Sequence, residues 1–235
     1  MNGTNPSESA KSLSDVFQKL QEIAESADGD FIYRGEPKYY EKVSSSLWRE
    51  CRKEFMSEDF DVEAIQNKML ERSKDYTHEK EEFEILTELQ HFGGYTNLID
   101  FTTDNHISLF FACNGHGGES GRIILLETTE EIKTYIKPPR NPQNRIIAQK
   151  SIFVRPPKGF IEPEQFAEVN IPESLKGAML DHLQKQHGIS TQTVYNDLHG
   201  FIRNKDTHLK ECIEVYNPET QPMKDSLQTD SITET

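Results

Sequence analysis

The sequence predicts an α+β fold: a single domain with a small mixed or antiparallel β core that is flanked by helices. Short apolar runs rich in β-branched and aromatic residues are typical of strands, and they are interspersed with segments whose apolar residues recur every three to four positions, as in helices. The strands and helices follow no regular strand–helix–strand spacing, which argues against a doubly wound parallel sheet. No internal repeat is visible in the 235 residues.

The first half of the chain predicts helix, strand and helix in that order. Apolar residues from Ser12 to Ala27 have helical spacing, and Ser14 and Asp15 are placed to cap or charge the start of that helix. The stretch "FIYRGE" (31–36) predicts a strand, and the helical pattern returns from Asp61 to Leu89. Residues 54–88 hold twelve Asp or Glu against four Lys or Arg, which we interpret as a solvated helix face.

The second half predicts shorter elements. "TNLIDFT" and "RIILLE" predict strands, the apolar run Ile107 to Cys113 predicts a helix between them, and the glycine-rich stretch 115–121 predicts a connecting loop. The remaining predictions are a strand pair in "NRIIAQKSIFVR", a helix from Ile171 to Gln186, a short helix begun by Ser190 and a closing strand in "KECIEVY".

Composition sets the limits of the domain. Residues 1–11 and 217–235 are polar and have few apolar side chains to bury, so we expect both ends to be disordered and the acidic tail to stay mobile. The folded domain is therefore predicted to span residues 12–216. No apolar run approaches the ~18 residues that a membrane span needs.

Charge and cysteine content narrow the classes of function. The net charge of −14 argues against broad, non-specific binding to nucleic acid, although residues 31–53 carry a local charge of +3. An odd number of cysteines, three, and the absence of a signal peptide predict a reduced, cytoplasmic compartment. Nucleotide-binding glycine motifs are absent, which argues against the usual nucleotide-binding folds. Because His91, His106 and His116 lack the spacing of a zinc site, we predict no metal.

Four polar residues interrupt apolar strands or lie at their ends: Arg34, His91, Asp100 and Gln149. Buried polar groups need partners, so these side chains meet either one another or a ligand. The sequence leaves both alternatives open. For Arg34 they are an ion pair, with Glu36 or another acid, and an anion clamp, because the guanidinium fork matches phosphate oxygens.

The ordered motifs of the chain resemble those of the FRG domain family. "FIYRGE", "SSSLWRE", "LQHFGGYTNLIDFTTDNHISLFFAC", "NRIIAQKSIFV" and "YNDLHGF" are similar to successive family motifs, over residues 31–205. The resemblance identifies matching positions at Arg34, Gly35, Ser46, Arg49, Gln90, His91, Asp100, Thr102, Phe111, Ala112, Arg145, Gln149 and Phe153. The chain departs from the family at Asn97, where an arginine is expected beside the site, and at Phe101 and Ser151.

The family's motif layout is similar to that of ADP-ribosyltransferases, and this similarity implies their fold and an NAD cofactor. It implies that Arg34 grips a pyrophosphate or ribose, that Gly35 lets the ligand approach the backbone, and that Tyr33 or Phe101 stacks on a ring. Thr102 and Arg145 complete the implied cofactor-binding set. Gln149 occupies the position of the transferase glutamate, and a neutral amide cannot act as a base. Asp100 would then stabilise the cationic ribosyl group, and His91 would accept a proton.

Two functions follow from the resemblance. One is an NAD-consuming ADP-ribosyltransferase or glycohydrolase that acts on a macromolecule in bacterial or phage conflict, as a toxin or in defence. The other is a non-catalytic module that binds a nucleotide-like ligand or a partner protein. The surviving Arg34, His91 and Asp100 favour the enzyme, and Gln149 favours the binding module.

Overall fold

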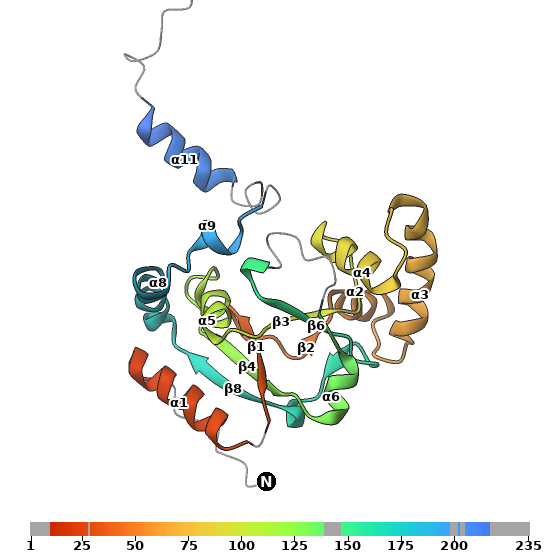
Figure 1. Cartoon of the computed structure of the whole chain (residues 1–235), viewed down its shortest axis with the longest axis horizontal. Helices are drawn as coiled ribbons and strands as arrows, with labels where there is room; N and C mark the ends of the chain where they lie inside the picture. The colour runs from red at the N-terminus through yellow and green to blue at the C-terminus, as the bar shows by residue number, and fades with distance from the viewer. Residues whose placement is uncertain (1–9, 28, 139–146, 198–201, 203–204, 217–235) are drawn as a thin grey trace, which may run out of the picture.

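The computed structural model describes residues 10–27, 29–138, 147–197, 202 and 205–216, and it has the predicted α+β class. Its centre is a six-stranded sheet in the order β5-β6-β3-β1-β4-β8, in which all neighbours are antiparallel (Figure 1). The strands are β1 (Phe31–Glu36), β3 (Ile99–Thr102), β4 (Gly121–Glu127), β5 (Ile136–Lys137), β6 (Ser151–Val154) and β8 (Phe166–Ile171). A second sheet pairs β2 (Val43–Ser44) with β7 (Phe160–Ile161).

Helices surround the sheet. They are α1 (Leu13–Glu25), α2 (Ser46–Phe55), α3 (Val62–Ser73), α4 (Glu82–His91), α5 (Asn105–Cys113), α6 (Glu130–Tyr135), α8 (Glu173–His187), α9 (Thr191–Val194) and α11 (Lys205–Val215), with 3-10 turns η1 (Lys74–Tyr76) and η2 (Pro163–Gln165). Local sequence places several of their starts, because a Ser, Thr or Asp oxygen accepts a free backbone N–H there. These caps are Ser12, Ser45, Asp61, Asp104, Thr129 and Ser190.

Strand β4 joins the two halves of the core. Successive side chains of a strand point to opposite faces of the sheet. Ile123 and Leu125 accordingly pack in one cluster with α1, α5 and α8, whereas Ile124 and Leu126 pack in a second cluster with α6, β2 and β7. Burial on both faces explains why the four residues from Ile123 to Leu126 are all apolar.

The structure corrects two of the predicted elements in the middle of the chain. The helical pattern from Asp61 to Leu89 is divided into α3 and α4, because η1 ends α3 and Thr77 is extended. Within the described part of "NRIIAQKSIFVR", residues 147–155, the structure has one strand, β6, and not the predicted strand pair. Residues 147–148 are helical and Lys150 has φ of 45°, so the chain enters β6 through a turn.

The C-terminal predictions also change. Ile171 ends β8, a strand that the sequence reading missed, and the helix begins only after Pro172. "KECIEVY" belongs to helix α11 and is not a closing strand. The apolar residues Leu209, Cys212, Ile213 and Tyr216 recur every three to four positions, as in a helix, and not at every second position, as in a strand. In Figure 1, α11 projects away from the sheet.

The termini predicted to be disordered lie, except for residues 10 and 11, outside the described residues, and the domain boundaries stay predictions. Across the described part of the chain, no helix combines the length and the apolar character needed to cross a membrane. The three cysteines are free thiols; Cys51 and Cys113 are buried and Cys212 is exposed.

Candidate functional site

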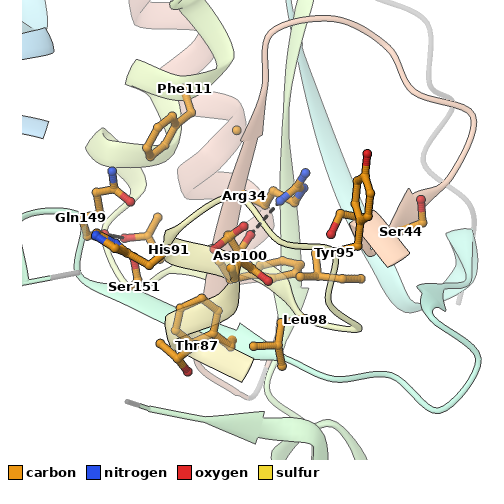
Figure 2. A pocket seen from close by; sticks show the side chains of 18 of the residues that line it. Arg34, Ser44, Thr87, His91, Tyr95, Leu98, Asp100, Phe111, Gln149 and Ser151 are labelled. Carbon is orange, nitrogen blue, oxygen red and sulfur yellow. Dashed lines mark hydrogen bonds between the residues drawn. The ribbon is translucent and has the colours of Figure 1, made fainter. Parts of the chain in front are cut away.

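A pocket of about 390 Å³ opens where β1 and β3 diverge. Strand β1 pairs with β4 along its whole length but meets β3 only at Tyr33 and Thr102. Past that point the side chain of Arg34 bridges the gap, because its Nη1 donates to the carbonyl oxygen of Asp100 at 3.0 Å (Figure 2). The volume lies within the ~300–1,000 Å³ range of small-molecule sites.

The pocket brings together the site residues that were predicted from distant motifs. All the predicted site residues that the structure describes line it: Tyr33, Arg34, Gly35, His91, Asp100, Phe101, Thr102 and Gln149. Arg145 lies outside the described residues. Figure 2 shows Asp100 near the centre, with Arg34, Ser44 and Tyr95 to one side of it and His91, Gln149 and Ser151 to the other.

Arg34 has the ion pair that one interpretation predicted. Its Nε donates to Glu36 at 3.0 Å, and the buried Glu36 carboxylate also accepts from Arg122, which lies 2.8 Å away. Arg122 is buried and bonds in addition to Glu168 and to the carbonyl of Tyr40. Arg34 is therefore held against a pre-formed charged network and still lines the pocket. Binding of an anion by Arg34 stays a prediction.

Arg49 is a second guanidinium in the pocket that our predicted site did not include. It projects from α2, and its Nη1 donates to the carbonyl of Ser44. Removal from water and the nearby positive charge of Arg34 lower the pKa of Arg49. Among the described residues no carboxylate lies within ion-pair distance of Arg49. The only signal that could have found it was its match to the family motif "SSSLWRE".

Gly35 lines the pocket, and the packing of α5 gives a structural reason for a glycine there. A Cβ on Gly35 would lie 1.9 Å from the carbonyl oxygen of Ser108 and 2.6 Å from the backbone nitrogen of Ala112. Helix α5 therefore requires a glycine at this position, because its backbone packs directly on β1. The close approach of α5 is sufficient to require glycine here, and the approach of a ligand to the Gly35 backbone stays a prediction.

His91 is the last residue of α4, where the negative end of the helix dipole favours a positive charge. Its Nε2 lies 3.6 Å from a carboxylate oxygen of Asp197, and both side chains are largely buried. Asp197 belongs to the "YNDLHGF" stretch, which the sequence reading noted as a family motif but did not place at the site.

Asp100 is exposed, and it is not the buried polar group that the strand pattern predicted. The side chains of β3 alternate, so Asp100 faces the pocket while Ile99 and Phe101 enter the core. Among the described residues, Asp100 is the one carboxylate that lines the pocket. The bond from Arg34 reaches its backbone carbonyl and leaves the carboxylate facing solvent in the pocket.

Gln149 lies in a turn before β6 and not on a strand. The side-chain Nε2 of Gln149 donates to the backbone carbonyl of Val194 at 3.1 Å. The backbone carbonyl of Gln149 accepts from the hydroxyl of Thr102 at 2.8 Å. These two bonds tie three separate segments together at one end of the pocket. The Thr102 hydroxyl thus already donates a hydrogen bond within the wall of the pocket.

The aromatic residues of the pocket differ in what they can offer to a ligand. Phe101 is only 3% exposed and belongs to a core cluster. Tyr33 is half-buried, and burial raises the pKa of its hydroxyl. Tyr95, which the sequence reading noted only as a departure from the family, is 50% exposed at the rim. Tyr33 and Tyr95 are therefore better placed than Phe101 to stack on a ring.

Asn97, at the position where the family pattern has an arginine, does not line the pocket in this chain. Asn97 is buried, and its amide donates to Glu63 and to the carbonyl of Pro156. These bonds direct the Asn97 side chain toward Glu63 of α3. In this chain Glu63 pairs with Arg155.

Comparison with known proteins identifies part of the chain. Residues 29–120 match the family model of the FRG domain. This range holds every predicted site residue except Arg145 and Gln149. No curated protein and no solved structure matches the chain.

Proposed function

Because residues 29–120 of this chain are an FRG domain, we propose that the pocket binds NAD and that the protein is an NAD-consuming ADP-ribosyltransferase or glycohydrolase. One observation carries the proposal: a single pocket is lined by two guanidiniums, a carboxylate and an imidazole. Figure 2 shows Arg34 and His91 on opposite sides of Asp100. These are the groups that a pyrophosphate and a breaking nicotinamide–ribose bond require.

The guanidinium side of the pocket suits phosphate. Arg34 is oriented by Glu36 and Arg49 by the Ser44 carbonyl, so both enter the pocket with restricted freedom. Charge-assisted bonds from arginine to phosphate are among the strongest hydrogen bonds in proteins. A bound pyrophosphate would relieve the repulsion between these two like charges.

The opposite side suits bond cleavage. The bond between nicotinamide N1 and ribose C1′ breaks, and its electron pair leaves with the neutral nicotinamide. The ribosyl group becomes an oxocarbenium ion, which the Asp100 carboxylate stabilises electrostatically. The acceptor hydroxyl, from water or a macromolecule, adds to C1′ and gives its proton to His91. Gln149 holds the wall through Val194 and Thr102 and orients ribose hydroxyls.

The Asp100→Asn variant tests this assignment. It is nearly isosteric and should lower nicotinamide release by roughly 10²–10⁴-fold while ligand affinity changes only a few-fold. Nicotinamide would be measured with purified protein, with and without a cell extract that supplies an acceptor. Asp181→Asn, at an exposed carboxylate on α8, is the matched control. No release by the wild type under either condition would overturn the enzymatic proposal.

One observation favours a second candidate, a non-catalytic module that binds a nucleotide-like ligand or a partner protein. The pocket carries glutamine where a transferase has its glutamate, and that amide already bonds to Val194. A binding module would take up ADP-ribose with no nicotinamide release, and Asp100→Asn would then change affinity alone.

The family resemblance extends the enzymatic proposal to a macromolecular target and a role as toxin or defence factor in bacterial or phage conflict. Induced expression in bacteria should then slow growth, and Asp100→Asn should restore it at equal protein level. Equal growth inhibition by wild type and Asp100→Asn would show that toxicity does not depend on this site.

A further inference from the structure

Three residues after α8 each contact a different residue that lines the pocket. The carbonyl of Val194 accepts from Gln149, the ring of Tyr195 packs edge-on at 6.1 Å from that of Phe111, and Asp197 lies beside His91. The pocket residues come from the turn before β6, from α5 and from α4. Val194, Tyr195 and Asp197 therefore support the pocket wall from behind, and none of them lies within the matched FRG range.

The contact between Asp197 and His91 has the geometry of an ion pair. Carboxylate Oδ2 and imidazole Nε2 are 3.6 Å apart, and the two side chains are 15% and 8% exposed. Limited access of water makes the attraction between unlike charges stronger than it is at the surface. The other charged groups that line the pocket with His91 are Arg34, Arg49 and Asp100.

We infer that Asp197 is the positioning residue of His91, so that the two form a carboxylate–imidazole dyad whose acidic member lies outside residues 29–120, the range that matches the FRG family model. An imidazole whose Nε2–H faces Asp197 presents Nδ1 as its basic nitrogen. The role of His91 as proton acceptor rests on the proposed function, but the dyad itself is a property of the chain.

The dyad assigns each proton in the transfer step. As the acceptor oxygen bonds to ribose C1′, its O–H bond breaks and the proton moves to Nδ1 of His91. The imidazolium keeps its Nε2 proton toward Asp197, whose charge stabilises the cation, and Asp197 remains ionised. The proton on Nδ1 then passes to solvent. No oxidant, metal or further reactant is needed for this step.

Titration of the imidazole by NMR tests the dyad without reference to activity. His91→Gln identifies the His91 resonance, which is then followed with pH in wild type, Asp197→Asn and the control Asp181→Asn. An adjacent carboxylate favours the charged imidazole, so Asp197→Asn should lower the titration midpoint of His91 by about one pH unit. Asp181→Asn should leave the midpoint unchanged. An unchanged midpoint in a folded Asp197→Asn variant would overturn the inference.

Kinetics then separate positioning from mere structural support. If wild type releases nicotinamide, Asp197→Asn should lower kcat at least tenfold with KM within a few-fold. It should also move the acid limb of the pH profile downward. Asp197→Glu, which keeps the charge, should restore part of the rate. An equal loss in both variants, with the pH profile unmoved, would reject positioning. A wild type without activity would reject the proposed function, while the NMR midpoint would still decide on the dyad.

Discussion

At the scale of single residues, the charged groups beneath the pocket explain how Arg34 can face a ligand. Glu36 is buried and accepts from both Arg34 and Arg122, so it stays paired when Arg34 turns toward an anion. Breaking a buried ion pair is costly mainly because it leaves the other charge without compensation. If Arg34 is lost, Glu36 still pairs with Arg122. If Arg122 is lost, both Glu36 and Glu168 lose the ion-pair partner that they share.

Thiol chemistry gives a test at this scale. Desolvation raises the pKa of Cys113 to about 12, and burial followed by the charge of Glu50 raises the pKa of Cys51. The thiolate is the reactive form, so these two buried thiols should be inert at pH 8. Titration of native protein with a disulfide reagent should therefore modify one thiol, Cys212. Unfolding should release all three, and Cys212→Ser should abolish the fast phase. Rapid reaction of two thiols in the native protein would contradict this burial.

At the scale of elements, α5 supports the pocket because its backbone rests directly on β1. Gly35 and Gly121 each leave room for it, since a Cβ on Gly121 would lie 2.0 Å from the carbonyl of Ala112. The N-terminus of α5 is held by Asp104, which accepts from the backbone of His106 and pairs with Lys150 at 2.7 Å. Packing at one end and capping at the other determine where α5 lies beside the pocket.

Gly35→Ala should destabilise the protein by at least 1–3 kcal/mol, the usual cost of overpacking, because its Cβ would meet backbone atoms that cannot rotate away. The matched control is Gly177→Ala in α8, where an added Cβ meets no atom within 4 Å. There alanine should stabilise the helix by about 0.5–1 kcal/mol. Urea unfolding measures both changes. A Gly35→Ala variant as stable as wild type would contradict the packing of α5 on β1.

The Asp104 cap predicts a pH dependence. Burial alone would raise the pKa of Asp104, but hydrogen bonds from Lys150 and from the His106 backbone bring its pKa below the usual value. A lowered pKa in the folded state stabilises the protein above the unfolded pKa of ~3.9, and the contribution is lost as pH falls through the folded pKa.

Asp104→Asn keeps the capping oxygen and removes the charge, so it should cost about 1 kcal/mol at pH 7 and almost nothing near pH 2. Chemical unfolding across this range measures the difference. Asp61→Asn, at the cap of α3, is the control, because the structure gives Asp61 a backbone hydrogen bond to Ala64 but no ion pair among the described residues. A cost for Asp104→Asn that persists undiminished at low pH would show that charge does not explain it.

At the scale of the whole molecule, the site is an assembly of segments far apart in the chain. Arg34 and Arg49 come from β1 and α2, Asp100 from β3 and His91 from α4. Gln149 also lines the pocket, and Val194 and Asp197 contact Gln149 and His91 from behind. A ligand that contacts several of these elements binds only when all are folded. Its binding free energy therefore adds to the stability of the entire domain.

ADP-ribose at 100 times its Kd should accordingly raise the unfolding free energy by about 2.7 kcal/mol, seen as a rise in Tm. Arg34→Ala and Arg49→Ala should each abolish most of this shift. The unliganded Tm of Arg34→Ala should change little, because Glu36 keeps its pair with Arg122. Arg72→Ala, on the exposed side of α3, should keep the full shift. If Arg34→Ala unfolds the protein, Arg34 is structural. If both pocket variants keep the full shift, the ligand binds elsewhere.

The α+β class, the strands β1, β3 and β4, the helix start at Ser190 and eight of the residues that meet in the pocket could be predicted from the sequence. Those features depend on local patterns of apolar residues or on family motifs, which survive without knowledge of distant contacts. The sequence reading was wrong about "KECIEVY", the segment around Gln149 and the exposure of Asp100. These features became clear only from the tertiary structure. The structure also showed that Arg49 lines the pocket, that α5 packs on Gly35 and that Asp197 lies beside His91. Each depends on which segments meet across the gap between β1 and β3, and the packing of residues far apart in sequence sets that gap.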